Sequence, residues 1–141
     1  MLAWRLARES LAQLDGEGAR LYGGRWNSPG RAMVYMADSA SLAVLEVWVH
    51  LDLPFDLLPA DYSLMAFELT NTRIEEAPQQ ALVDPRKFGD AWLATARSPI
   101  LRVPSFIVPE ETNLLINPLH PISARITLLS KRPFSFDQRL F

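Results

Sequence analysis

A glutamate inside an apolar segment is the residue best placed to do chemistry in this sequence. Glu46 is the only charged side chain between Asp38 and Asp52. A carboxylate in apolar surroundings is costly unless it is paired or faces a cleft. We therefore keep two interpretations of Glu46. It is either a catalytic carboxylate, or a structural residue in an ion pair or on one exposed stripe of a helix.

An arginine in a glycine-rich loop is the second candidate. Residues 22–30 hold three glycines and one proline, and Arg25 lies among them beside Trp26 and Asn27. Glycines let a ligand approach the backbone closely, and an arginine there can clamp a phosphate or pyrophosphate. The segment matches neither the P-loop nor the dinucleotide-binding fingerprint. A plain tight turn is the alternative interpretation.

Three further polar residues could contact a ligand. Tyr35 could stack on a flat ligand, although many such tyrosines belong to a core. Ser105 and Asn113 could hydrogen-bond a ligand or only satisfy the backbone. Since Ser105 lies in no G-x-S-x-G elbow, a hydrolase triad is not expected.

Metal and disulfide chemistry are not expected. The chain has no cysteine, so it offers neither a disulfide nor a thiolate ligand. His50 and His120 are far apart, and no H-E-x-x-H motif is present. The metal prediction is therefore none.

The elements that must position these residues are a few short strands and two main helices. The loop at 22–30 should lead into a strand at 31–36, and Asp38 or Ser39 should cap a helix over 40–51. That helix is apolar on nearly all sides, which is typical of a buried helix. Asp84 followed by Pro85 predicts a second helix over 85–97. The remaining predicted strands include the one that starts near Arg5, and those at 62–69, 100–108, 113–116 and 125–129.

This pattern predicts an α+β fold with short mixed or antiparallel strands in a single domain, residues 1–141. Phe134, Phe136 and Phe141 are expected to anchor the C-terminal segment. Hydrophobic residues make up 49% of the 141 and charged residues 21%, which is ordinary globular usage.

The charge balance argues against nucleic acid as a partner. The net charge is −2, with no basic excess or basic stripe. Lys87 and Lys131 are the only lysines, so the other cationic residues are arginines, which suit phosphate contacts. No uncharged apolar stretch approaches the roughly 18 residues of a membrane span. The N-terminus lacks the pattern of a signal peptide. We expect a cytoplasmic protein without membrane contact.

Taken together, these motifs resemble the RES-domain family, the toxins of bacterial Xre–RES toxin–antitoxin pairs. The resemblance covers nearly the whole chain. It is carried by residues 4–6, 23–27 with Gly30, 34–35, 42–50, 92–93, 103–105, 113–121 and 133–140. It implies an ADP-ribosyltransferase-like fold. It also implies an enzyme that uses NAD⁺ as substrate, not as cofactor, and cleaves its nicotinamide–ribose bond with water or phosphate as acceptor.

The resemblance also implies roles for individual residues. The Arg, Glu and Ser of the family name fall on Arg25, Glu46 and Ser105. Glu46 would stabilise the ribosyl cation that forms as the bond breaks, Arg25 would hold the pyrophosphate, and Ser105 would orient the ribose or the amide. A departure follows Ser105: the bulky Phe106 stands where the family carries a small residue, and it could narrow the cleft.

The remaining implied roles are those of substrate-binding residues. Tyr35 would stack on the nicotinamide, Asn113 would orient the ribose or the amide, and Arg5 would be a second phosphate contact. The implied partner is a small Xre-type helix-turn-helix antitoxin that covers the cleft. Two alternatives stay open: an ADP-ribosyltransferase that modifies a specific protein, and a non-catalytic module that keeps the fold.

Overall fold

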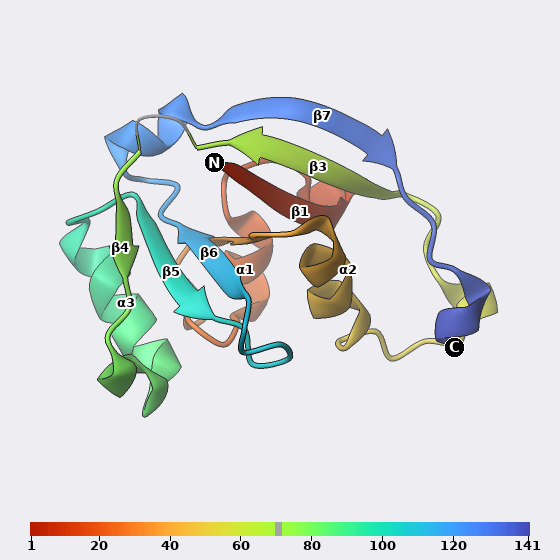
Figure 1. Ribbon diagram of the computed structural model, residues 1–141, viewed down its shortest axis with the longest axis horizontal. Helices are drawn as coiled ribbons and strands as arrows, with labels where there is room; N and C mark the ends of the chain where they lie inside the picture. Colours follow the sequence, from red (N-terminus) through yellow and green to blue (C-terminus); the bar gives the residue numbers. More distant parts are fainter. Residues whose placement is uncertain (70–71) are drawn as a thin grey trace.

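One seven-stranded sheet organises the described chain, residues 1–69 and 72–141 of a computed structural model (Figure 1). The strand order across the sheet is β4-β5-β6-β2-β1-β3-β7. Paired neighbours are antiparallel except β4 and β5, which are parallel. The strands are β1 (Leu2–Arg8), β2 (Val34–Ala37), β3 (Tyr62–Glu68), β4 (Ile74–Glu76), β5 (Ile100–Pro104), β6 (Thr112–Ile116) and β7 (Thr127–Pro133).

Three α-helices accompany the sheet in the described residues: α1 (Glu17–Tyr22), α2 (Ala40–Trp48) and α3 (Pro85–Thr95). The short 3-10 turns are Glu9–Leu11, Phe55–Leu57, Gln79–Leu82, Pro121–Arg125 and Gln138–Leu140. This confirms the α+β class, the mixed sheet and the two main helices that the sequence predicts. Within the same residues, no helix combines the length and the apolar character that crossing a membrane requires.

The sheet divides between the neighbouring strands β2 and β1. β1 pairs with β3 over all its residues, and β2 pairs with β6 over all of its own, but β1 and β2 share one paired position, Trp4 opposite Ala37. Figure 1 shows the consequence: β1, β3 and β7 extend across the top, while β4, β5 and β6 descend steeply on the left. Since strands that separate no longer cover each other's side chains, the junction of the two halves is available for a site.

Helix α2 begins where the sequence predicts and ends earlier. Ser39 is its N-cap, and the Ser39 hydroxyl accepts a hydrogen bond from the Leu42 amide at 3.1 Å. The helix ends at Trp48 instead of residue 51. The expectation of a fully buried helix is wrong. Leu42 and Ala43 are its buried residues, and Val49 just beyond it is 46% exposed. Part of its apolar surface faces a cavity instead of the core.

Helix α3 is set by local signals and docks through a glycine. The Asp84 carboxylate accepts a hydrogen bond from the Lys87 amide at 3.2 Å, and Pro85 occupies the first turn. The helix ends at Thr95, because Ala96 takes a left-handed conformation with φ of 51°. Gly89 lies so close to the Trp26 carbonyl oxygen that a Cβ at this position would overlap it. Absence of a side chain therefore lets α3 contact the glycine-rich loop directly.

The core forms on both faces of β5 and β6, because consecutive apolar residues in these strands point to opposite faces of the sheet. Ile100, Leu114 and Ile116 face a cluster that continues into the β1 half of the sheet. Leu101 and Leu115 face the other side, where they meet Trp26 and Trp92 beneath α3. The glycine-rich loop is thus anchored by a buried tryptophan on the α3 side of the sheet.

Several predicted boundaries differ from the structure. The strand predicted over 100–108 ends at Pro104, since residues 105–111 form a turn closed by a hydrogen bond from the Ser105 amide to the Glu111 carbonyl at 3.0 Å. Among the strands and α-helices, α1 and β4 were not predicted, and the first strand begins at Leu2 instead of near Arg5. The other elements are present with shifted bounds. The strands occupy 34–37 (predicted 31–36), 62–68 (predicted 62–69), 112–116 (predicted 113–116) and 127–133 (predicted 125–129), and the second helix occupies 85–95 (predicted 85–97).

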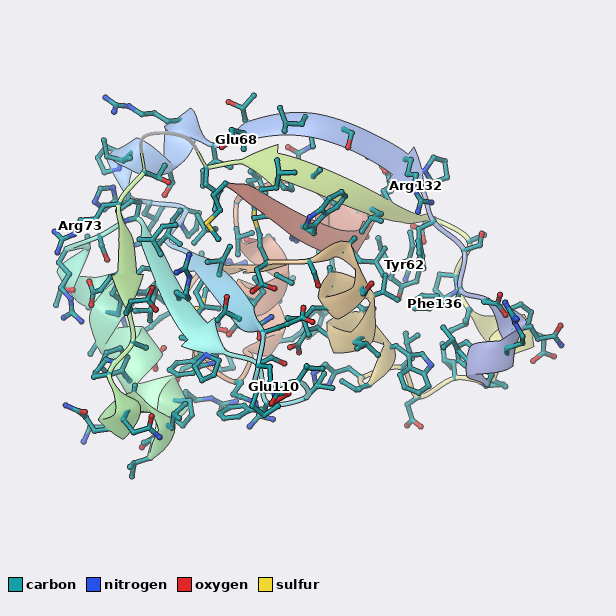
Figure 2. The ribbon with its side chains drawn as sticks, in the orientation of Figure 1. Tyr62, Glu68, Arg73, Glu110, Arg132 and Phe136 are labelled. Carbon is teal, nitrogen blue, oxygen red and sulfur yellow. The ribbon has the colours of Figure 1, made fainter. Side chains whose placement is uncertain are left out.

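The C-terminal segment is anchored mainly by one ring. Phe136 is buried and packs edge-on against Tyr62 and Phe134, with ring centroids 5.5 and 5.2 Å apart (Figure 2). Phe141 was also predicted to be an anchor. Its ring touches Phe136 and Phe55, but 47% of the residue is exposed, so it closes the edge of this cluster without entering it.

Candidate active site

A cavity of about 1,040 Å³ lies where the two halves of the sheet meet. Its walls come from β1, α1, the glycine-rich loop, β2, α2, the start of α3, the segment 104–107 and β6. This volume is at the upper end for small-molecule sites, which run from roughly 300 to 1,000 Å³. Five of the six predicted site residues line it: Arg5, Arg25, Tyr35, Glu46 and Asn113.

Glu46 projects from α2 and is held by a serine from the other half of the chain. The Ser105 hydroxyl donates to Glu46 Oε1 at 2.9 Å. The same hydroxyl accepts from the amides of Ile107 and Val108 at 3.0 and 3.1 Å. Its proton is therefore directed at the carboxylate, because both backbone donors occupy its lone pairs. In the described residues Glu46 has no cationic partner within salt-bridge distance.

Ser105 itself is 1% exposed and does not line the cavity. The sequence led us to expect a substrate contact, but the hydroxyl lies behind the carboxylate instead. The geometry therefore favours Ser105 as a positioning residue for Glu46.

Tyr35 connects the cavity to the glycine-rich loop. Its hydroxyl donates to Asn27 Oδ1 at 2.6 Å and accepts from the Trp26 amide at 3.1 Å. A Cβ on Gly24 would lie 2.5 Å from that hydroxyl, so a side chain at this position would push the tyrosine away. Asn27 is fully buried and donates through its amide to the carbonyls of residues 19, 28 and 31. The loop and the tyrosine thus form one hydrogen-bonded unit.

Burial dominates the ionisation of this tyrosine. It raises the pKa of Tyr35 to about 12, against the hydrogen bond from Trp26 and the charges of Arg86 and Arg25, which lower it. The phenol is therefore neutral at physiological pH. It acts as a fixed hydrogen-bonding group and a ring, not as an anion.

Arg25 is exposed, and its guanidinium donates to no acceptor among the described residues. Its guanidinium carbon lies 4.1 Å from the centroid of the Phe106 ring. Within the described residues it has no hydrogen bond or ion pair, so its N–H donors are available to an anionic ligand. The position agrees with the anion-binding role that the loop suggests.

Arg5 enters the cavity from β1 and is more buried. Its Nη2 donates to the Leu11 carbonyl at 2.7 Å, whereas its buried Nη1 has no hydrogen-bond partner in the described chain. Burial lowers the pKa of the Arg5 guanidinium, and the charge of Asp15 partly opposes this. A buried donor without an acceptor costs free energy.

Asn113 lies on β6 opposite Ala37, and its Nδ2 is 3.5 Å from the Met36 carbonyl, at the limit of a hydrogen bond. Its amide therefore remains largely available toward the cavity.

Arg86 is a charged cavity residue that the sequence did not lead us to predict. Arg86, in the first turn of α3, donates to the Gly24 carbonyl from Nε at 3.3 Å and Nη2 at 3.2 Å, and it also lines the cavity. Its place near the glycine-rich loop depends on how α3 docks. The Asp84-Pro85 pair predicted the start of this helix but not that Arg86 would reach the cavity. In the described residues no group of three histidine, aspartate or glutamate side chains is arranged to hold a metal ion.

Comparison with known proteins adds the family. A model of the RES domain matches residues 2–137. This chain belongs to the RES domain family. Among curated members, the "Prs ADP-ribosylating toxin" of Sphingobium sp. is 38% identical, over 97% of this chain and 94% of that protein. A protein of Yersinia enterocolitica named "Toxin Res" is 39% identical, over 99% of each chain.

A solved structure shares the fold of this chain. The M. tuberculosis MbcT–MbcA toxin–antitoxin complex contains a chain that matches with a TM-score of 0.78 and 21% identity, covering 95% of this chain and 84% of that one. At this identity the likeness concerns the fold. It confirms that the α+β architecture described above is shared with a toxin of a toxin–antitoxin complex.

Proposed function

We propose that this RES-family toxin cleaves the nicotinamide–ribose bond of NAD⁺ in the cytoplasm, with water or phosphate as acceptor. The observation that carries the proposal is the meeting of Glu46, held by Ser105, with Arg25 and Tyr35 around one cavity. Their residue types match the three parts of the substrate: a ribose that becomes cationic, a diphosphate and a flat ring.

The reaction needs charge stabilisation more than it needs a nucleophile. As the bond between ribose C1 and the nicotinamide nitrogen breaks, nicotinamide leaves with the electron pair and the ribose becomes an oxocarbenium-like cation. Water or phosphate then attacks C1, giving ADP-ribose or its 1-phosphate, and water releases a proton. A carboxylate fixed beside C1 stabilises the developing positive charge. Glu46 fits this role, because Ser105 holds it without neutralising its charge.

The diphosphate would meet arginines on two sides. Arg25 presents uncommitted N–H donors, and Arg86 adds positive charge beside it on the same rim. Arg5 offers an unpaired Nη1 from β1. Arginine suits this task since its donors match phosphate oxygens in pairs. Tyr35 and Asn113 would orient the nicotinamide and the ribose, with the Tyr35 ring held by its hydroxyl.

The test is nicotinamide release from NAD⁺ by the purified protein, with and without phosphate, with products resolved by NMR. Glu46→Gln keeps the size and the acceptor oxygen for Ser105 but removes the charge. We expect a fall in kcat of about 100- to 1,000-fold, as for loss of a group that stabilises transition-state charge. Glu110→Gln makes the same change at an exposed position in the 105–111 turn and is the matched control (Figure 2). Wild-type turnover in Glu46→Gln would exclude the assigned role.

A second function uses the same residues with a protein as acceptor. It is favoured by one relative, 38% identical, that is named an ADP-ribosylating toxin. Incubating the protein with NAD⁺ labelled in the adenosine and a bacterial extract separates the two. Label on one protein band supports transfer, whereas label in free ADP-ribose or its phosphate supports hydrolysis or phosphorolysis. A folded protein with neither product would be a non-catalytic module.

We also propose that an Xre-type helix-turn-helix antitoxin covers the cavity. The proposal is supported by exposed apolar side chains around the cavity. Tyr22 is 78%, Val49 46% and Phe106 42% exposed, and all three line the cavity. Exposed apolar groups around a cavity are typical of a partner surface. Co-purification with the antitoxin should abolish nicotinamide release. Full activity of the bound toxin would contradict the proposal.

A further inference from the structure

We infer that Phe106 is a positioning residue that holds the Arg25 guanidinium ready for the diphosphate of the substrate. This inference rests on the proposed function. The contact is direct: the guanidinium carbon lies 4.1 Å from the ring centroid. In the described part of the chain Arg25 forms no hydrogen bond or ion pair, so this ring contact is what restrains its guanidinium there.

The ring that holds Arg25 is itself fixed. Phe106 stacks on Trp26, with an angle of 6° between the ring planes and 6.4 Å between the centroids. Trp26 is 3% exposed, and its amide donates to the Tyr35 hydroxyl. Phe106 is 42% exposed, so it reaches from this buried support to the surface of the cavity.

The turn that carries Phe106 links the two charged groups of the site. Ser105 bonds to Glu46, and the next residue, Phe106, contacts Arg25. The turn is rigid because the Ser105 amide donates to the Glu111 carbonyl and the Ser105 hydroxyl accepts from two turn amides. One short segment therefore sets the relative places of the carboxylate and the guanidinium. Figure 2 marks the turn by Glu110.

Stacking suits an arginine that must bind an anion. The negative face of an aromatic ring attracts the cation, while the N–H donors lie in the guanidinium plane and stay open to phosphate oxygens. An unrestrained arginine loses much rotamer freedom when it binds a ligand. With Phe106 in place, part of that freedom is already lost before the substrate arrives.

The main test is the KM for NAD⁺ in Phe106→Leu, which removes the ring and keeps an apolar side chain. We expect KM to rise about 3- to 30-fold, the range that corresponds to a cation–π contact, while kcat changes by less than about twofold. Phe106→Tyr retains the aromatic face and should raise KM less. Phe134→Leu is the matched control, because the Arg132 guanidinium carbon lies 5.6 Å from the Phe134 ring centroid and neither residue lines the cavity. An unchanged or lower KM in Phe106→Leu would overturn the inference.

A double-mutant cycle shows whether Phe106 acts through Arg25. If it does, Phe106→Leu should have little further effect on KM in an Arg25→Ala background. Equal effects in both backgrounds would mean that Phe106 contacts the substrate or shapes the turn independently, and the inference would fail.

Binding of inorganic pyrophosphate separates this inference from the proposed function. Chemical shifts of the arginine Nε–H groups can follow it in wild type and in Phe106→Leu. If the wild type binds pyrophosphate more tightly than the variant, the inference stands even where NAD⁺ is not cleaved and the proposed function has failed. Equal affinity, or no binding by the wild type, would overturn it.

Discussion

Among single residues, Tyr35 of β2 is the one whose hydroxyl holds the glycine-rich loop. Its hydroxyl satisfies the Trp26 amide and the Asn27 side chain, so the loop that carries Arg25 depends on it. Gly24 leaves the space that this hydroxyl occupies. The tyrosine therefore supports the loop as well as lining the cavity.

Tyr35 gives a prediction for alkaline pH. Its pKa is raised to about 12 in the folded protein, against about 10 in an unfolded chain. The raised value favours the neutral form, so this contribution to stability is complete below pH ~10 and is lost as pH rises to about 12. It amounts to at most about 2–3 kcal/mol. Urea unfolding across this range should show a smaller decline in Tyr35→Phe than in wild type. If the free energy of unfolding declined equally in both proteins, the pH dependence would come from a group other than Tyr35.

Ser105 gives a prediction about catalysis. Ser105→Ala leaves Glu46 without its donor and two turn amides without their acceptor. We expect the free energy of unfolding to fall by about 1–3 kcal/mol and kcat for nicotinamide release to fall about tenfold. Ser105→Thr retains a hydroxyl and should lose less of both. If Ser105→Ala kept full kcat, the hydrogen bond to Glu46 would have no role in the reaction.

At the level of whole elements, α3 supports the glycine-rich loop through several contacts along its length. Gly89 abuts the Trp26 carbonyl, Arg86 donates to the Gly24 carbonyl, and the Asp90 carboxylate accepts from the Ser28 amide at 2.9 Å. The helix thus holds the loop at three points.

Gly89→Ala tests this support. The new methyl group would meet the Trp26 carbonyl oxygen, so α3 or the loop must move. Such overpacking costs about 1–3 kcal/mol or more, and displacement of the loop should raise KM for NAD⁺. Gly18→Ala in α1 is the control for stability, because its Cβ would only make an ordinary contact with Leu11 at 3.4 Å. Equal stability in both variants, measured by thermal unfolding, would contradict the proposed docking.

At the scale of the whole molecule, charge is distributed unevenly. The net charge is −2, yet three arginines, Arg5, Arg25 and Arg86, line the cavity against two carboxylates, Glu46 and Asp84. A local cluster of cations can attract an anionic dinucleotide although the protein as a whole is weakly acidic.

This arrangement predicts a dependence on salt. The screening length falls from about 10 Å at 0.1 M to about 3 Å at 1 M ionic strength, so KM for NAD⁺ should rise several-fold over this range. Nicotinamide riboside, which lacks the diphosphate, is the control substrate and should show little change. A KM for NAD⁺ that is independent of salt would argue that the exposed arginines do not contribute to binding.

Features that depend on neighbours along the chain could be predicted from the amino-acid sequence. Ser39 and the Asp84-Pro85 pair mark the starts of α2 and α3, because helix caps act within one turn. The residue types also pointed to Glu46, Arg25 and Tyr35, and the order of motifs to the RES family. These signals are local, or are ordered along the chain, and they need no knowledge of packing.

Features that depend on contacts between distant segments could not be predicted and are seen in the folded chain. β4 consists of three residues that exist as a strand because β5 lies beside them, and the six-residue α1 has no side-chain cap to announce it. The half-buried state of α2 and the place of Arg86 follow from how the helices dock. The bond between Ser105 and Glu46 joins residues 59 apart. Such contacts form only when the sheet brings its two halves together, which no spacing in the sequence can specify.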